Sequence, residues 1–424
     1  MSRGEPLDPD GSVVIVGAGL GGLRSAEALR ANGFRGSLTL VGEERRPPYD
    51  RPPLTKQLLA GAWDEDRVAL TTTEALVERG IDHMAGARAV SLEAEAMEVR
   101  LADGRSLRGD AVVLATGATP RRLAGTEGMA GVHVIRTMEQ SLALRDELAA
   151  LGPGARVVVV GAGFIGGEVA STAAAGGCAV TVVDVLEVPL SPVVGEEVGR
   201  WITELHRREG IEVRTGATIE RVEPRRTGGR AAVVLADGTR LDADVVVVGI
   251  GVRPETAWLE GSGVVLQDGV VTDAALFAAD GVVAVGDLAR FTWHHALGTE
   301  QVRIEHWEVT AQLAAHAATA LLAGRATAEQ VSLVPYFWSD QHGRKLQMLG
   351  RPRGTDDVTR VAGSLDEARF TFLTHRDGRV TGVVGLASPR TVMRSTPMAP
   401  DLSIRHAKTR RTRLMSVSRR GTRS

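Results

Sequence analysis

Glycine-rich segments that could bind phosphate groups occur twice in this sequence. Residues 17–22 read GAGLGG and residues 161–166 read GAGFIG, so both contain the spacing G-x-G-x-x-G. In such a loop the glycines allow a tight turn, close approach of the backbone to a pyrophosphate, and close packing of a helix on a strand. The N-terminus of the following helix offers unpaired N–H groups to the phosphates. The repeated spacing therefore predicts two dinucleotide sites.

A carboxylate follows each glycine loop at the distance where a ribose is held. Glu43 and Asp184 both lie about 20 residues past their glycines, where an acid can accept hydrogen bonds from ribose hydroxyls. Asp184 would repel the 2′-phosphate of NADP, and the next residues, Val-Leu-Glu, include no arginine to pair with it. We therefore expect the second site to prefer NAD(H).

The elements around the two loops are those that would hold them in place. Apolar strands are predicted at 13–16 and 156–160, helices at 20–30 and from Phe164 onward, and further strands at 37–41 and 179–183. A glycine-rich loop that only packs would not require this order. Strand, loop, helix, strand and acid in succession predict an α/β dinucleotide-binding unit, and its repetition predicts two of them.

Further strands and a cationic loop separate these units. Strands are expected at 96–101 and 111–114, joined by the turn Asp103-Gly104, and at 231–235 and 245–248, with a turn at Asp237-Gly238. The apolar strand 281–287 ends at Asp287, a plausible position for a ligand-facing acid. In the loop RPPYDRPPLTKQLL the prolines exclude a helix until Leu54, and one can begin near Thr55. Composition alone favours a solvated loop for its cations Arg51 and Lys56.

Length, cysteine count and charge limit the alternatives. The 424 residues predict two or three domains, with a long helix within 303–322 and a small separate sheet domain from Val334, whose strands are expected at 345–349, 370–374 and 380–385. One cysteine, Cys178, excludes an intrachain disulfide and is typical of a reducing compartment. The polar start and the absence of an 18-residue apolar run predict a soluble, cytoplasmic protein. Residues 391–424 carry nine Lys or Arg against one acid and are expected to be a disordered basic tail.

Eight segments together resemble one known family. They are VVIVGAGLGGL, YDRPPLTK, LATGATP, VVVVGAGFIGGEVA, VVVVGIGVRP, AVGDLARF, RIEHW and PYFWSDQ, in the family's order from residue 12 to about 390. The chain resembles the FAD-dependent NADH:ferredoxin reductases that serve bacterial cytochromes P450 and ring-hydroxylating dioxygenases. These belong to the pyridine nucleotide-disulfide oxidoreductase superfamily but lack its redox disulfide.

The resemblance implies an α/β fold with two Rossmann-like dinucleotide-binding domains, of the glutathione-reductase kind, and a small α+β C-terminal domain. Residues 1–120 and 250–325 would form a discontinuous FAD-binding domain, and residues 121–249 an inserted NAD-binding domain. Residues 326–390 would form an interface domain, and 391–424 would be the basic tail, where the sequence departs from the family.

The resemblance also assigns roles to individual residues. Lys56 and Glu168 would be the catalytic pair near the nicotinamide, Asp287 would meet the ribityl chain of FAD, and Trp307 and Trp338 would flank the flavin. The other cofactor contacts implied on the FAD side are Gly17, Gly19, Leu20, Gly21, Glu43, Arg51, Ala89, Thr116, Gly117, Arg136, Gly286 and Glu305. Those on the NAD side are Gly161, Gly163, Phe164, Ile165, Gly166, Asp184 and Gly251.

The missing cysteines determine the expected reaction. Disulfide-containing relatives carry C-x-x-x-x-C where this chain has RPPLTKQLL, so electrons cannot leave through a thiol here. We expect FAD to take a hydride from NADH and to pass single electrons to a ferredoxin, of the [2Fe–2S] kind or similar. No metal is expected, because His294, His295 and His306 are too isolated to form a metal site. Nor do we expect membrane or nucleic-acid partners, and the chain should be a monomer or weak dimer.

Two alternatives remain open at this point. One is an NADH-sensing flavoprotein that acts through binding, as apoptosis-inducing factor does, with the basic tail as its only support. The other is a rubredoxin or nitrite reductase component.

Overall fold

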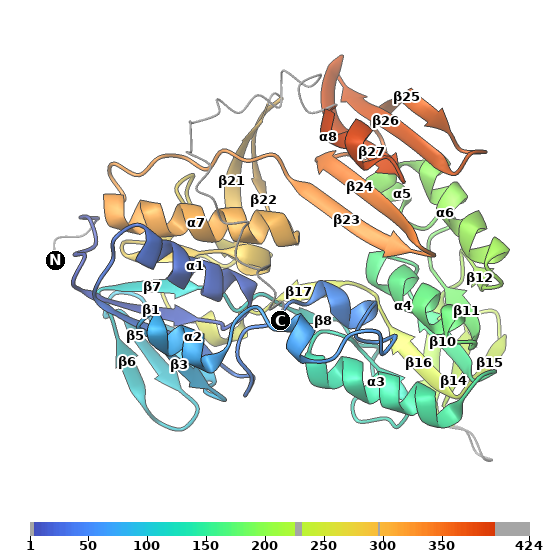
Figure 1. The fold of residues 1–424 in the computed structure, drawn as a ribbon, viewed down its shortest axis with the longest axis horizontal. Coiled ribbons are helices and arrows are strands. Elements are labelled where there is room, and N and C mark those ends of the chain that lie inside the picture. The colour runs from blue at the N-terminus through green and yellow to red at the C-terminus, as the bar shows by residue number, and fades with distance from the viewer. Residues whose placement is uncertain (1–3, 225–230, 296, 395–424) are drawn as a thin grey trace, which may run out of the picture.

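The first sheet is mostly parallel and is built mainly from apolar runs of the kind that strands buried on both faces require. The computed structural model describes residues 4–224, 231–295 and 297–394. Its six-stranded sheet has the order β19-β20-β7-β1-β2-β3. The strands are β1 Ser12–Val16, β2 Ser37–Gly42, β3 Ile81–Ala85, β7 Ala111–Leu114, β19 Phe277–Ala279 and β20 Val282–Ala284. Helices α1 (Leu20–Ala31) and α7 (Trp307–Ala323) pack side by side on it (Figure 1).

A second parallel sheet repeats the same design. Its order is β12-β11-β10-β16-β9, from β9 Val132–His133, β10 Arg156–Val160, β11 Ala179–Val183, β12 Glu212–Arg214 and β16 Val245–Val248. The helices of this lobe are α3 (Met138–Leu151), α4 (Phe164–Ala175), α5 (Ser191–Val194) and α6 (Glu196–Arg208). The short antiparallel strands β8 (Ala118–Pro120) and β17 (Val252–Pro254) pair where the chain passes between the lobes (Figure 1).

Each lobe also contains a three-stranded antiparallel sheet, of which the sequence predicted only the middle strand. These are β4 (Ala89–Glu93), β5 (Glu98–Leu101) and β6 (Ser106–Arg108), and β13 (Ile219–Glu223), β14 (Ala231–Leu235) and β15 (Arg240–Ala243). The turn Asp103-Gly104 therefore joins β5 to β6, and Asp237-Gly238 joins β14 to β15. The prediction that these turns lead directly to 111–114 and 245–248 is wrong, because β7 and β16 pair within the parallel sheets. Strands β6 (SLR) and β15 (RLDA) are short and mix polar with apolar residues, so no apolar run marks them.

The proline-rich loop also differs from its prediction. Residues Pro52–Thr55 form a 3₁₀ turn, and Lys56 leaves helical geometry at φ −126° and ψ −101°. The N–H of Leu58 then bonds back to the carbonyl of Pro53, so a regular helix does not begin near Thr55. Leu54, Leu58 and Leu59 are buried, which fixes this irregular loop against the second lobe.

The C-terminal part is an antiparallel sheet in the order β23-β24-β27-β26-β25. Its strands are β23 Tyr336–Gln341, β24 Arg344–Gly350, β25 Asp357–Ser364, β26 Arg369–Arg376 and β27 Arg379–Leu386, followed by helix α8 Pro389–Arg394. The tail that the sequence predicts to be disordered from residue 391 is instead helical over 391–394, where Val392 is fully buried. Its remainder, 395–424, lies outside the described residues.

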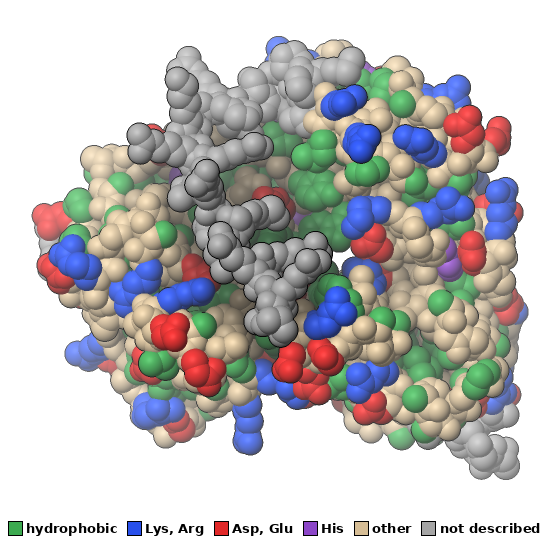
Figure 2. All heavy atoms as spheres, in the orientation of Figure 1, with side chains coloured by type: hydrophobic (Ala, Val, Ile, Leu, Met, Phe, Trp, Pro, Cys, Tyr) green, Lys and Arg blue, Asp and Glu red, His purple; other side chains and the backbone are tan. Residues whose placement is uncertain are grey.

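A long hairpin, β21 (Ala289–His295) and β22 (Gly298–Val302), extends from the first lobe toward this sheet (Figure 1). Acidic and basic side chains intermingle over the face shown in Figure 2. Within the described ranges no helix is long and apolar enough to cross a membrane, and no cluster of His, Cys, Asp or Glu could hold a metal ion.

Candidate active site

A large cleft lies between the two parallel sheets and the C-terminal sheet. Its volume of about 1470 Å³ exceeds the roughly 300–1,000 Å³ of a pocket for one small ligand, so it can admit parts of two dinucleotides. Most of the predicted site residues line it: Gly17, Gly19, Leu20, Gly21, Glu43, Arg51, Lys56, Ala89, Thr116, Gly117, Arg136, Phe164, Ile165, Glu168, Gly286, Asp287, Glu305, Trp307 and Trp338. Gly161, Gly163, Gly166, Asp184 and Gly251 are not in its wall. Gly161 and Asp184 directly follow β10 and β11, Gly163 and Gly166 lie at the start of α4, and Gly251 directly precedes β17.

The first glycine of each loop makes a turn that no other residue could make. Gly17 has φ +110°, and a Cβ there would lie 2.2 Å from the carbonyl oxygen of Ala115. Gly161 has φ +97°, and its Cβ would lie 2.4 Å from the carbonyl oxygen of Gly249. Both contacts are far shorter than van der Waals contact, so the two loops turn in the same way for the same steric reason.

The second glycine of each loop faces open space at a helix N-terminus. Gly19 caps α1 and Gly163 caps α4, and neither helix has a side-chain cap. A Cβ at Gly163 would meet nothing within 4 Å, and one at Gly19 would meet only the Arg51 guanidinium at 3.9 Å. The unpaired N–H groups of both first turns are therefore open to an anion, which is the donor set that a pyrophosphate requires.

The two ribose-site acids are held differently. Asp184 accepts hydrogen bonds from the N–H of Ala162 at 2.6 Å and from that of Leu186 at 2.8 Å, so it also supports the second glycine loop. Glu43 is exposed and lies 3.8 Å from the Arg88 guanidinium. Asp184, the acid of the second unit, is thus fixed before any ligand is bound, whereas Glu43, the acid of the first unit, is not.

Arg51 is built into the wall of the cleft. It donates to Glu44 at 2.7 Å, to the Tyr49 hydroxyl at 3.1 Å and to the backbone oxygen of Arg136. The prediction from composition that Arg51 and Lys56 lie in a solvated loop is therefore wrong. The side chain of Lys56 is only 11% exposed.

Arg136 and Asp287 form a second ion pair in the cleft wall. Their side chains lie 3.0 Å apart. Burial lowers the pKa of Arg136, while the charge of Asp287 acts in the opposite direction. Arg51 is thus paired with Glu44 and Arg136 with Asp287, and both guanidinium groups line the cleft, that of Arg51 beside the open end of α1.

Glu168 is the point where three distant parts of the chain meet. One carboxylate oxygen accepts from Lys56 Nζ at 2.9 Å and from Thr55 Oγ1 at 2.6 Å. The other accepts from Ser339 Oγ at 2.8 Å and from the N–H of Asp340 at 3.1 Å. Glu168 is 5% exposed, so this ion pair is buried and fully hydrogen-bonded. The sequence identified Lys56 and Glu168 but missed the other donors, although Ser339 and Asp340 stand in the segment PYFWSDQ.

Aromatic side chains form the opposite wall. Trp307 donates its indole N–H to Asp50 at 2.7 Å, and its ring meets that of Trp338 edge-on with centroids 6.2 Å apart. Tyr336 stacks on Trp338 at 5.9 Å, and Lys345 Nζ lies 5.7 Å from the Trp338 ring. Asp50 was missed by the sequence reasoning; burial raises the pKa of its carboxyl.

A second aromatic group crosses the cleft. The ring of Phe337 lies 4.4 Å from Phe164 on α4 and 4.9 Å from His306 at the start of α7. Burial lowers the pKa of His306 to about 4, so its imidazole is neutral at pH 7. Cys178, by contrast, is partly buried behind α4 and does not line the cleft, and burial raises the pKa of its thiol.

Comparison with known proteins identifies the family. Residues 11–314 match the model of the pyridine nucleotide-disulphide oxidoreductases. The chain belongs to this family. Residues 336–408 match the model of the reductase C-terminal domain, so the likeness continues past Arg390, where the sequence reasoning placed its end.

Relatives within the pyridine nucleotide-disulphide oxidoreductases are similar over almost their whole length. Putidaredoxin reductase of Pseudomonas putida is 35% identical, covering 89% of each chain. The ferredoxin–NAD(+) reductase component of the anthranilate 1,2-dioxygenase system of Burkholderia cepacia is 38% identical, covering 88% of this chain and 90% of the relative. A crystal structure of the covalent putidaredoxin reductase–putidaredoxin complex superposes with a TM-score of 0.86 at 33% identity, covering 93% of this chain and 94% of that one.

These findings confirm the predicted fold class, with its two Rossmann-like sheets and small C-terminal domain, and the resemblance on which it depended. The protein is an oxidoreductase, and the cofactors of its family are FAD and NAD(H). The two glycine loops fit both cofactors, since each leaves a helix N-terminus open where a pyrophosphate would bind.

Proposed function

We propose that the protein transfers electrons from NADH through FAD to a ferredoxin-type iron–sulfur protein that serves a cytochrome P450 or a ring-hydroxylating dioxygenase. The observation that carries this proposal is the single cysteine of the chain, which lies away from the cleft. No redox disulfide can form beside the flavin, so the electrons must go to an external acceptor. Reductases of ferredoxin-dependent oxygenase systems are among the relatives, which supports a ferredoxin in that role.

We further propose a division of labour among the domains. Residues 1–120 and 250–325 bind FAD, residues 121–249 bind NAD(H), and residues 326–390 form the interface with the acceptor. In support, strands from both parts of the first range share one sheet, β19-β20-β7-β1-β2-β3. The glycine loop at 17–22 is also the one that shares its cleft with Arg51, Asp287 and Trp307.

The residues of the cleft have separate tasks in this proposal. The open N-terminus of α1 and Arg51 bind the pyrophosphate of FAD, and Asp287 binds its ribityl hydroxyls. The open N-terminus of α4 binds the pyrophosphate of NADH, and Asp184 binds its adenosine ribose. Bound FAD supplies the redox chemistry, since it accepts a hydride and releases electrons one at a time.

The Lys56–Glu168 pair supplies a fixed electrostatic environment. Four donors hold Glu168, so its carboxylate keeps the ammonium of Lys56 in one place at the meeting point of the lobes. A preorganised charge in a water-poor site stabilises charge that develops during reaction more strongly than the same charge in water. Removing one partner of a buried pair leaves the other uncompensated, which typically costs about 3–5 kcal/mol.

The aromatic wall is the proposed route to the acceptor. Trp338 lies on β23, at the edge of the cleft, with Trp307 on one side and Lys345 beside it. We also propose that the protein works in the cytoplasm, because its one cysteine is typical of a reducing compartment.

The test is reduction of putidaredoxin by NADH with the purified flavoprotein. We expect ferredoxin reduction that depends on NADH. In the Glu168→Gln variant, kcat/KM of this NADH-dependent reduction should fall at least tenfold. Replacing Trp338 with alanine should slow ferredoxin reduction while leaving that of ferricyanide, a small acceptor, within about twofold. A wild-type protein that reduces ferricyanide rapidly but no ferredoxin would contradict the proposed acceptor.

A further inference from the structure

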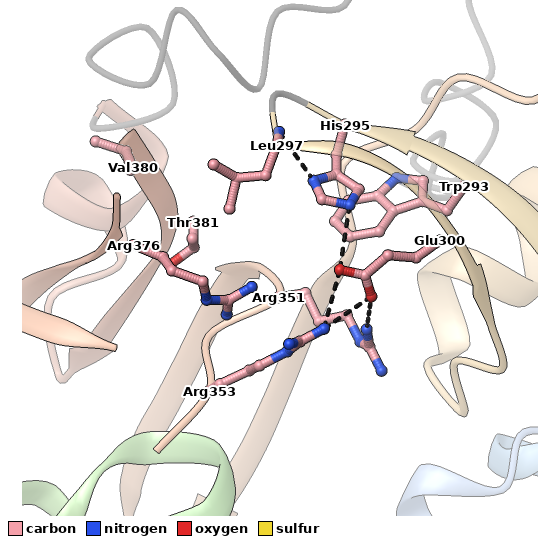
Figure 3. Close-up of a pocket in the computed structure, with 9 residues that line it drawn as sticks. All are labelled: Trp293, His295, Leu297, Glu300, Arg351, Arg353, Arg376, Val380 and Thr381. Carbon is pink, nitrogen blue, oxygen red and sulfur yellow. Dashed lines mark hydrogen bonds and ion pairs between the residues drawn. The ribbon is translucent and has the colours of Figure 1, made fainter. Parts of the chain in front are cut away.

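A small cavity lies outside the active site, where the β21–β22 hairpin meets the C-terminal sheet (Figure 3). The hairpin contributes Trp293, His295 and Glu300. The other side contributes three cations, Arg351 and Arg353 from the loop after β24 and Arg376 from β26. The proposed reaction uses none of these residues. The hairpin belongs to the first lobe, so this cavity marks a second contact between that lobe and the sheet that carries Trp338.

Glu300 binds two arginines at this contact. Its carboxylate accepts from Arg351 Nη1 at 2.6 Å and from Arg353 Nη2 at 2.8 and 2.9 Å (Figure 3). The carboxylate is 29% exposed and the two guanidinium groups are 37% and 44% exposed. An isolated exposed ion pair contributes little, but a carboxylate shared by two neighbouring cations also offsets their mutual repulsion.

His295, on the same hairpin, lies beside Glu300. The His295 ring stacks on Trp293 with centroids 4.5 Å apart, and its Nδ1 accepts the N–H of Leu297 at 3.3 Å. The neutral ring therefore carries its proton on Nε2, which lies 3.3 Å from Glu300. Trp293 is in turn tied to the backbone oxygen of Leu333 at 3.1 Å. The carboxylate is thus presented from a fixed position.

The other end of the contact is equally well held. The N–H of Arg353 donates to Asp356 at 3.0 Å, and the same carboxylate accepts from Thr381 and Arg376 of the sheet. Gly354, the next residue, donates to the backbone oxygen of Pro192 on α5 at 2.8 Å. The loop 351–354 is therefore fixed between the hairpin, α5 and the C-terminal sheet.

This loop reaches the active site as well. Arg351 and Arg353 line the large cleft in addition to the small cavity. The loop directly follows β24, which pairs with β23, the strand of Trp338, over Arg344–Leu349. Two hydrogen-bonded strands therefore connect the loop to Trp338.

We propose that Glu300 is a positioning residue for electron exit. By holding Arg351 and Arg353 it fixes the loop 351–354, and through β24 and β23 it sets where Trp338 stands beside Trp307. Without the carboxylate, two adjacent guanidinium groups repel each other and the loop loses its attachment to the first lobe. The inference rests on the proposed function only in naming a ferredoxin as the acceptor.

The test uses Glu300→Gln, Arg353→Gln and the double variant, with Glu196→Gln as the matched control. Glu196 is likewise in an arginine pair, but on the surface of α6. For Glu300→Gln we expect KM for putidaredoxin to rise at least fivefold, while NADH–ferricyanide turnover stays within twofold. Because the two residues act together, the double variant should be no worse than the poorer single one. Amide hydrogen exchange should rise at least fivefold in 351–354 and in β23, and Glu196→Gln should change neither.

Two results would overturn the inference. One is unchanged exchange in 351–354 and β23, and the other is an equal loss of ferricyanide and putidaredoxin reduction, which would indicate a general structural role. The exchange measurement needs no acceptor. If the wild-type protein reduces no ferredoxin, the proposed function fails. Amide hydrogen exchange in 351–354 and β23 then decides by itself whether Glu300 holds the sheet.

Discussion

At the scale of single residues, the carboxylates of this protein differ in how firmly they are fixed. Glu168 has four donors and Asp184 has two backbone donors, whereas Glu43 has one distant arginine. A carboxylate that is already fixed by hydrogen bonds to its own loop loses less conformational entropy when it binds a ribose. Selectivity between NADH and NADPH should therefore reside mainly in Asp184.

The corresponding prediction concerns Asp184→Asn. The wild-type protein should prefer NADH over NADPH by at least tenfold in kcat/KM, a difference of about 1.4 kcal/mol. Asparagine keeps one of the two acceptor oxygens that the backbone N–H groups use and removes the charge that repels the 2′-phosphate, so the preference should narrow severalfold. Glu187→Gln removes a charge three residues away and should leave it unchanged. Equal use of both nucleotides by the wild-type protein would contradict the assignment.

At the scale of elements, the apolar strands and glycine loops were predictable and the polar connections were not. Strand β1 and helix α1 lie where the pattern of Val13–Val16 and the glycines predicted them. The strands β6 and β15 were missed because segments of only three and four residues leave no periodic signal, and their stability comes from pairing with β5 and β14. The helix expected near Thr55 fails because tertiary contacts of Leu58 and the ion pair of Lys56 override local preference.

The contact between α6 and the β23–β24 turn carries a pH prediction. His206 is 3% exposed and shares a 2.8 Å hydrogen bond with His342, and burial together with His342 lowers its pKa to about 4. Gln341 also faces His206, while Glu209 and Arg344 act on His342. Because the unfolded histidine titrates near 6.5, the unfolded state binds more protons between pH 6.5 and 4. The contribution of His206 to the free energy of unfolding is therefore fully present above about pH 6.5. It falls by up to about 3 kcal/mol as the pH drops toward 4.

Urea unfolding at pH 8, 6 and 4.5 measures this dependence. His206→Gln should weaken this dependence without abolishing it, because burial also lowers the pKa of His306 to about 4, whereas replacing the exposed His294, which lies on β21, should leave it unchanged. If the wild-type and His206→Gln proteins lose stability equally on acidification, the histidine pair is not the cause.

At the scale of the whole molecule, the site consists of residues that only the tertiary fold brings together. Lys56, Glu168 and Ser339 are separated by more than 100 residues each, and no spacing rule places them around one carboxylate. The resemblance supplied the first two because their motifs are distinctive. Glu300 has no such motif, since its role comes from a hairpin that meets another sheet. Sequence patterns thus predicted each dinucleotide unit but not the contacts between units.

The assignment of one cofactor to each unit gives the last prediction. Gly19 and Gly163 cap α1 and α4 with φ of −87° and −71°, which any residue can adopt, and both face open space. Aspartate is a favourable N-cap, so Gly19→Asp and Gly163→Asp should fold normally while their charge repels a pyrophosphate. The wild-type protein should be yellow, with one FAD per chain by absorbance at 450 nm. Gly19→Asp should lose the flavin, whereas Gly163→Asp should keep it and show at least a tenfold higher KM for NADH.

Serine at the same positions is the control for size, because it caps a helix without a charge. Gly19→Ser should retain most of its flavin, and Gly163→Ser should keep its KM for NADH within a few-fold of wild type. The two aspartate variants must fail in different ways if each sheet serves one dinucleotide. Loss of flavin from Gly163→Asp, with retention by Gly19→Asp, would reverse the two assignments, because the open helix N-terminus that receives the FAD pyrophosphate would then be that of α4.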